Sequence, residues 1–225
     1  MIEHPKDWQK VGREIGLTEV GEAIRQSILS INCNCLSFSG GLDSSLLLHF
    51  MLEAGRKVQI FNGTCSQGHP DTYYSQLAVR FFESKFNTKI TGQWFVIDNA
   101  TGNKLVKAFY KLVGQHTDSI IAGDGIDEFA GGYYDHQEKP YEFRYFYHMR
   151  KLQLEQLAPL DKNSGTVRVH LPYLDTRVTS LLWQIPLSEK VDATCRKKLM
   201  VQLAEGKLPR EIIDRRKYGF GTRGE

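Results

Sequence analysis

Short apolar runs alternate with amphipathic segments along the first 122 residues of this chain, and this alternation limits the folds that it can adopt. Four apolar runs are expected to be strands, at residues 31–39, 57–62, 89–98 and 119–122. Before and between them apolar side chains recur at helical spacing, and Thr18 is the expected N-cap of the first helix. Strands separated by helices in this way predict a doubly wound parallel sheet, an α/β fold.

The pattern becomes helical after Gly132. Three further helices are expected, at residues 141–159, 175–184 and 194–204. No flexible linker separates the two parts, so we expect a single domain of 225 residues. Its α/β half covers about residues 17–135, and its helical half covers residues 136–225.

Composition and charge exclude several classes of protein. No apolar run approaches the ~20 residues that span a bilayer, and the N-terminus lacks the apolar core of a signal peptide. The four cysteines form no C-x-x-C pair, which argues against a zinc site. We therefore expect a soluble, cytoplasmic protein with no membrane partner. The net charge of +3 does not indicate a nucleic-acid partner by itself.

A basic segment closes the chain. Residues 196–225 contain nine Lys and Arg residues against four Asp and Glu residues. Such a segment can be a nucleic-acid patch, a solvated face or a clamp for a polyphosphate.

A glycine turn follows the first expected strand. It reads Ser39-Gly40-Gly41-Leu42-Asp43-Ser44-Ser45. Two glycines let the backbone turn sharply and leave its N–H groups uncovered. These groups, the hydroxyls of Ser39, Ser44 and Ser45, and the N-terminus of the next helix predict an anion-binding site. In a parallel sheet this turn lies at the carboxyl end of a strand, where ligands bind.

An acidic loop follows the fourth expected strand. Asp124, Asp127 and Glu128 lie there within five residues, among glycines. A doubly wound sheet would bring this loop to face the glycine turn. Carboxylates beside a polyphosphate require a cation between them, and Mg²⁺ binds one or two carboxylates together with phosphate oxygens. We therefore expect Asp43 and Asp127 to be Mg²⁺ ligands; the alternative is an acidic surface turn.

Residues 39–45 resemble the S-G-G-x-D-S loop of the ATP pyrophosphatases, which grips the pyrophosphate part of ATP. The stretch at residues 120–133 resembles the G-E-G-x-D-E-x-F-x-G-G-Y segment of asparagine synthetases and β-lactam synthetases, with Asp124 where the family usually carries Glu. Residues 171–175 resemble the P-F-L-D segment of the same branch. Upstream of it, Arg168 and His170 stand where the family tends to place Glu and Arg.

The basic segment resembles the K…L-P…R-x-K-x-x-F pattern of the family, through Lys197, Leu208-Pro209, Arg215, Lys217 and Phe220. In the family the two lysines contact phosphates and the negative charge that develops during the reaction. Together the four motifs cover about residues 30–222. They are similar to the synthase domain of asparagine synthetase, which has an adenine nucleotide alpha hydrolase-like fold.

The resemblance implies ATP and Mg²⁺ as cofactors and an ATP-dependent ligase that forms AMP, pyrophosphate and an amide. The implied binding residues for ATP and pyrophosphate are Ser39, Gly40, Gly41, Asp43, Ser44, Ser45 and Gly123. The implied catalytic residues are Lys217, Lys197 and Asp124. The substrates would be a small carboxylate, such as aspartate, and ammonia or another amine.

Glutamine-dependent relatives carry a glutaminase domain whose nucleophile is a cysteine directly after the initiator Met, where this chain has Ile2. Ammonia is therefore expected from solution or from a separate glutaminase or other ammonia-supplying protein. A partner or a second copy of the chain, as a homo-oligomer, would then cover the site. Three alternatives stay open: a tRNA-modifying enzyme that holds RNA with its basic segment, a non-catalytic ATP-binding partner subunit, and a cyclase that makes a lactam.

Overall fold

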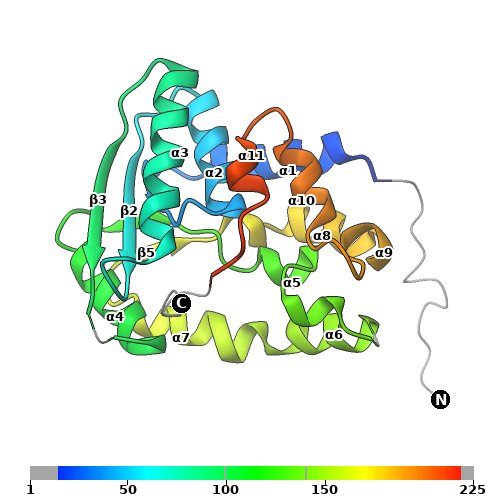
Figure 1. The fold of residues 1–225 in the computed structure, drawn as a ribbon. Helices are drawn as coiled ribbons and strands as arrows, with labels where there is room; N and C mark the ends of the chain where they lie inside the picture. The colour runs from blue at the N-terminus through cyan, green and yellow to red at the C-terminus, as the bar shows by residue number, and fades with distance from the viewer. Residues whose placement is uncertain (1–14, 99, 140, 219–225) are drawn as a thin grey trace.

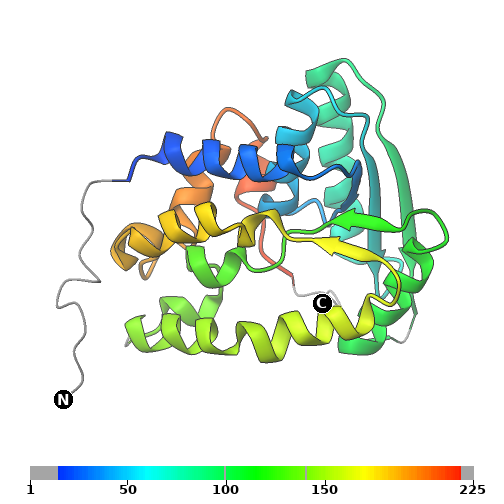
Figure 2. The same ribbon diagram turned by 180° about the vertical axis from the view of Figure 1, so that it is seen from behind.

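The computed structural model describes residues 15–98, 100–139 and 141–218. A parallel sheet lies toward one end of the molecule, with helices on both of its faces (Figures 1 and 2). Its five strands are β1 (Cys35–Ser37), β2 (Gln59–Thr64), β3 (Thr91–Val96), β4 (Ser119–Ile121) and β5 (Arg168–His170). They lie in the order β3-β2-β1-β4-β5, and all neighbours are parallel. The predicted doubly wound α/β fold is confirmed.

Two buried clusters hold the layers together, one on each face of the sheet. Neighbouring strand residues point to opposite faces, so Ile60 and Ile121 belong to the larger cluster, whereas Phe61 and Ile120 belong to the smaller one. The larger cluster includes side chains of α1 (Leu17–Ser30), α2 (Leu42–Glu53) and α3 (Pro70–Phe86). The smaller one includes side chains of α4 (Gly102–Val113). Burial on both faces explains why β4 and the residue after it read as a continuously apolar run.

The strand order creates a crevice between β1 and β4. The chain builds outward from β1 through β2 to β3 and then returns to the other side of β1 with β4. Leu36 of β1 pairs directly with Ile121 of β4. The glycine turn follows β1 and the acidic loop follows β4, so both loops leave the sheet at this switch point, as predicted.

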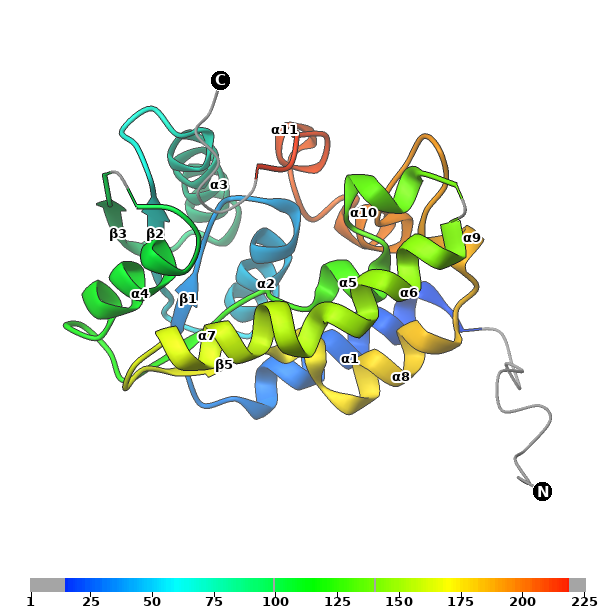
Figure 3. The same ribbon diagram turned by 90° about the horizontal axis from the view of Figure 1, so that it is seen from below.

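A long helical rod runs along one side of the molecule (Figure 3). It consists of α6 (Tyr141–Lys151), a π-helical turn (Leu152–Leu157) and α7 (Ala158–Asn163). The sequence predicts one regular helix here, and the structure differs in that a π-helical turn interrupts it. In such a turn the hydrogen bonds join residues five apart instead of four, which changes the direction of the side chains.

The remaining helices follow β4 and β5. They are α5 (Ile126–Ala130), α8 (Thr176–Gln184), α9 (Leu187–Lys190), α10 (Lys198–Ala204) and α11 (Arg210–Ile213). In the part of the chain that the structure describes, no helix is both long and apolar enough to cross a membrane.

Several predicted boundaries were wrong. The first helix is capped by Gly16 and not by Thr18, because the Gly16 carbonyl accepts hydrogen bonds from the N–H groups of Glu19 and Val20. The first strand has three residues instead of nine. The helix expected from residue 194 begins at Lys198, because Asp192 ties Thr194 and Cys195 into a turn.

One strand comes from the half that we expected to be helical. Strand β5 covers only Arg168–His170, yet it pairs with the whole of β4 and completes the sheet. Its three residues are too few to show the alternation that identifies a strand in a sequence.

Candidate functional site

A cavity of about 410 Å³ lies where the glycine turn, the acidic loop and the C-terminal basic segment meet. Nine of the eleven predicted site residues line it: Ser39, Gly41, Asp43, Ser44, Gly123, Asp124, Asp127, Lys197 and Lys217. Three segments that are far apart in the sequence therefore form one site. Gly40 and Ser45 do not line the cavity, and Phe220 lies outside the described residues.

The glycine turn is held tightly against α3. Gly40 has a φ of +69°, and a Cβ at this position would collide with the backbone of Tyr74 and Ser75. Only glycine combines this conformation with so close an approach. On the cavity side, the Ser39 hydroxyl accepts from the N–H of Gly41 at 3.2 Å and lies 3.2 Å from the Ser44 hydroxyl. The turn therefore presents polar groups of Ser39, Gly41 and Ser44 to the cavity.

Ser45 was expected to contribute its hydroxyl to the anion-binding site, but it does not reach the cavity. It is fully buried in α2, and its hydroxyl has no hydrogen-bond partner among the described residues. At this position its side chain faces the protein interior and not the anion site.

Lys197 joins the two predicted metal ligands. Its Nζ lies 2.5 Å from Oδ2 of Asp43 and 2.6 Å from Oδ1 of Asp127. Although burial lowers the pKa of Lys197, the two carboxylates outweigh this effect and raise it above its ordinary value. Gly132 makes the approach possible, because a Cβ there would collide with the side chains of both Asp127 and Lys197.

Asp127 also forms an ion pair with Lys217, the second lysine among the predicted catalytic residues. The Lys217 ammonium lies 5.4 Å from the centre of the Tyr133 ring, and its side chain is partly exposed. Burial alone would raise the pKa of Asp127, but Lys197 and Lys217 hold it below its ordinary value. Asp127 is therefore an ionised carboxylate shared by two ammonium groups.

The two aspartates fit a magnesium site. Their carboxylates converge on one point, which the Lys197 ammonium takes in this structure. The second oxygen of Asp43, Oδ1, is buried and has no hydrogen-bond partner among the described residues. A free carboxylate oxygen beside a second carboxylate is the type of donor that Mg²⁺ prefers.

Asp124 lies at the boundary with a second cavity of about 420 Å³. Asp124, Ser37 and Gln156 line both cavities. Asp124 is exposed to solvent, but the protein atoms around its carboxyl desolvate it in part, and this effect, together with the charges of Asp127 and Glu128, raises its pKa to about 6. The pKa of Glu128 in the same loop is also raised, chiefly by burial.

A network that the sequence analysis missed supports this boundary. The Tyr133 hydroxyl and the Gln156 amide both donate to Oε1 of the buried Glu128, each at 2.5 Å. Gln156 belongs to the π-helical turn, which directs its side chain into both cavities. Glu128 could have been predicted as a site residue, because it belongs to the acidic loop. The sequence around Gln156 contains no motif that would have identified it.

The segment that resembles P-F-L-D supports the site from behind. Tyr173 is fully buried, and its hydroxyl donates to the backbone carbonyl of Asp43 at 2.9 Å. The two departures upstream, Arg168 and His170, lie in β5 and do not line the cavity.

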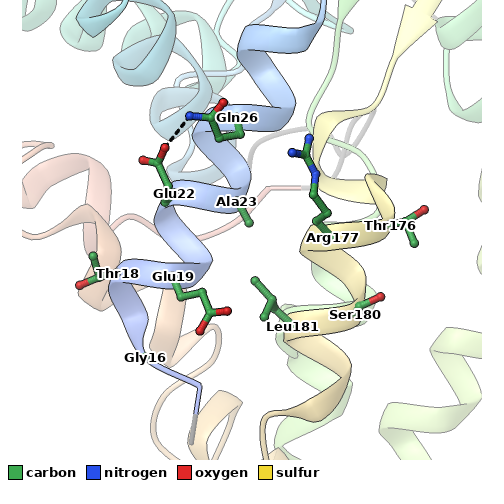
Figure 4. Close-up of a pocket in the computed structure, with 10 residues that line it drawn as sticks. All are labelled: Gly16, Thr18, Glu19, Glu22, Ala23, Gln26, Thr176, Arg177, Ser180 and Leu181. Carbon is green, nitrogen blue, oxygen red and sulfur yellow. Dashed lines mark hydrogen bonds between the residues drawn. The ribbon is translucent and has the colours of Figure 1, made fainter. Parts of the chain in front are cut away.

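A separate groove of about 840 Å³ lies between α1 and α8 (Figure 4). None of the predicted site residues lines it. Ala23 and Leu181 face each other across it, with Glu19, Glu22 and Arg177 near its edges. The candidate site is therefore the polar cavity at the crevice and not this groove.

The family model described as asparagine synthase matches residues 20–168 and 162–224. These ranges contain every residue of the candidate site. A search of curated proteins finds no match.

Proposed function

The chain belongs to the asparagine synthase family, and we propose that it is an ATP-dependent ligase that activates a carboxylate as an acyl-adenylate. In the proposed reaction a carboxylate oxygen attacks the α-phosphorus of ATP, and the bond to the β-phosphate breaks. Pyrophosphate leaves with the negative charge. The nitrogen of ammonia or another amine then attacks the acyl carbon, releases AMP, loses a proton and forms an amide.

The observation that carries this proposal is the meeting of three segments in one cavity. Ser39 and Gly41 supply polar groups for phosphate oxygens, Asp127 supplies a carboxylate, and Lys217 supplies a cation. Anion-binding groups, carboxylates and a lysine in one cavity are what a nucleotide with its metal ion requires. We therefore favour the interpretation in which the basic segment binds a polyphosphate over the alternative in which it binds RNA.

Charge balance suggests how the lysines act. Lys197 and Lys217 now neutralise Asp43 and Asp127. Mg²⁺, when bound to these two aspartates, would neutralise phosphate oxygens and stabilise the leaving group. The two ammonium groups would then be free to donate to phosphate oxygens. Fixed cations aimed at charge that develops in the transition state commonly supply most of the rate enhancement.

Asp124 is our candidate for orienting or deprotonating the amine. It lies between the cavity that contains the lysines and the second cavity, which has apolar walls formed by Val106 and Phe109. A carboxyl with a raised pKa is suited to proton transfer near neutral pH. In this arrangement the nucleotide phosphates occupy the first cavity and the amine approaches past Asp124.

The test is to incubate the full chain with Mg-ATP, ammonium and each amino acid in turn, and to quantify AMP and pyrophosphate. We expect equal amounts of both products, released only with the correct carboxylate. Lys217→Ala should lose this activity, whereas Lys198→Ala should keep it, because the half-buried Lys198 next to Lys197 pairs with Asp192 outside the cavity. Release of ADP, or equal rates for wild type and Lys217→Ala, would contradict the proposal.

A further inference from the structure

The segment that carries Lys217 into the cavity is not part of a helix or a strand. It follows α11, and residues 215–218 have no regular secondary structure. Among the described residues, none of its four main-chain N–H groups donates to a main-chain carbonyl. Its position must therefore depend on side chains.

Arg215 is the side chain that makes the most contacts from this segment. Its guanidinium donates to the carbonyl oxygen of Ser39 at 3.1 Å and forms an ion pair with the carboxylate of Asp71. It also lies over the ring of Tyr74, 4.5 Å from the centre. The side chains of Arg215 and Asp71 are each only 5% exposed. A buried arginine with three kinds of partner is fixed in one orientation.

These partners belong to the two elements that form the phosphate side of the cavity. Ser39 begins the glycine turn, while Asp71 and Tyr74 lie in the first turns of α3. The same turn presses Gly40 against the backbone of Tyr74. Arg215 therefore joins the C-terminal segment to the glycine turn and to the helix that supports it.

We propose that Arg215 is a positioning residue that docks the C-terminal segment and so places the Lys217 ammonium against Asp127. The docking itself is a property of the free protein, and only its catalytic consequence rests on the proposed function. Two extended residues span about 7 Å, so a segment released at position 215 would let Lys217 move by much more than 1 Å. A misplacement of about 1 Å can lower a catalysed rate by about 10²-fold.

The best variant removes both members of the ion pair. Loss of Arg215 alone would leave the Asp71 carboxylate buried without its cation, which destabilises proteins for a reason unrelated to docking. The double variant Asp71→Asn/Arg215→Met avoids this charge and still releases the segment. Arg216→Ala is the matched control, because Arg216 is the exposed neighbour and does not line the cavity.

The decisive measurement needs no substrate. We would treat the full-length proteins with an amine-acetylating reagent and follow the modification of Lys217 by peptide mass spectrometry, with the exposed Lys89 as internal reference. In the wild type and in Arg216→Ala, the ion pair with Asp127 should protect Lys217. In the double variant Lys217 should react severalfold faster, while the reactivity of Lys89 stays the same.

Pyrophosphate release gives the second readout. It should fall about 10²-fold in the double variant and stay at the wild-type rate in Arg216→Ala. If the double variant does not fold, as judged by circular dichroism, Arg215→Lys replaces it. This variant keeps a charge opposite Asp71 but loses the planar fork that reaches two partners at once.

An unchanged Lys217 reactivity in a folded variant would overturn the proposal. Absence of pyrophosphate release in the wild type would instead count against the proposed function alone. The two failures are therefore distinguishable, because the acetylation experiment reports on docking without any turnover.

Discussion

Two lysines seven residues apart are almost equally buried, yet their surroundings differ completely. Lys197 is 6% exposed and lies between two carboxylates at the cavity. Lys190 is 2% exposed, and its Nζ donates to the Tyr145 hydroxyl at 3.1 Å. No carboxylate among the described residues lies within ion-pair distance of Lys190.

The difference appears in the direction of the two pKa shifts. Burial lowers the pKa of Lys190 to about 8, because the charge of Glu189 and the contacts with the Tyr145 phenol and its ring do not offset the desolvation of the ammonium. The pKa of Lys197 is raised in spite of its burial. Burial by itself therefore does not identify a functional lysine in this chain. Opposed carboxylates distinguish Lys197 from Lys190, because the two carboxylates would repel each other unless a cation joined them.

The largest effect is expected when the cation between the carboxylates is removed. In Lys197→Met the half-buried Asp43 carboxylate, whose side chain is 20% exposed, loses its cation, so the free energy of unfolding should fall by up to about 3–5 kcal/mol. Urea denaturation would measure this loss. The double variant Asp43→Asn/Lys197→Met should recover part of it, and failure to recover would show that charge is not the cause.

The next largest effect is expected at Lys217, where the variant should lower the reaction rate and leave the stability almost unchanged. Lys217→Ala should lower pyrophosphate release by about 10²–10³-fold, the usual loss when one stabilising donor is removed. The free energy of unfolding should change little, because the Lys217 side chain is 35% exposed and Asp127 keeps Lys197. If Lys217→Ala instead lost much of its stability in urea, the main role of Lys217 would be to stabilise the fold, as expected for Lys197.

Replacement of Lys190, the other buried lysine, should raise the stability of the protein instead of lowering it. Lys190→Met should stabilise the protein by up to about 3 kcal/mol, since a pKa lowered from 10.5 to about 8 measures the cost of burying the charge. At pH 7 the folded and unfolded states both bind the proton, so the cost is fully present. Between pH 8 and pH 10.5 the folded state has released it, and the advantage of Met should shrink. Thermal melts at pH 7 and pH 10 would measure this, and destabilisation at pH 7 would contradict the comparison.

The smallest expected effect is a dependence of the reaction rate on pH that is caused by Asp124. Because the pKa of Asp124 is raised to about 6, its basic form predominates above that value. If Asp124 accepts the amine proton, kcat/KM for the amine should be half-maximal near pH 6 and fall below it. In Asp124→Asn this inflection should disappear. A wild-type midpoint near pH 4 would exclude Asp124 as the group that titrates.

The sequence predicted the parts of the site that depend on strand order. Parallel strands end at the same edge, so the loops after β1 and β4 had to meet once the alternation of strands and helices was recognised. It did not predict β5, whose three residues show no pattern, or the role of Gln156, which depends on an irregular helix. Arg215 and Asp71 are 144 residues apart, and nothing local in the sequence indicates that they pair.

The π-helical turn makes the number of residues in the rod as important as their identity. A π-helical turn holds about one residue more than an α-helical turn over the same rotation, so deletion of one residue from it would let a regular helix form while α6 and α7 keep their directions. Gln156 lies inside the turn, so its side chain would lose its present direction. In this part of the chain, a one-residue deletion would therefore reshape the site more than most substitutions, and related sequences can differ in the second cavity through helix length alone.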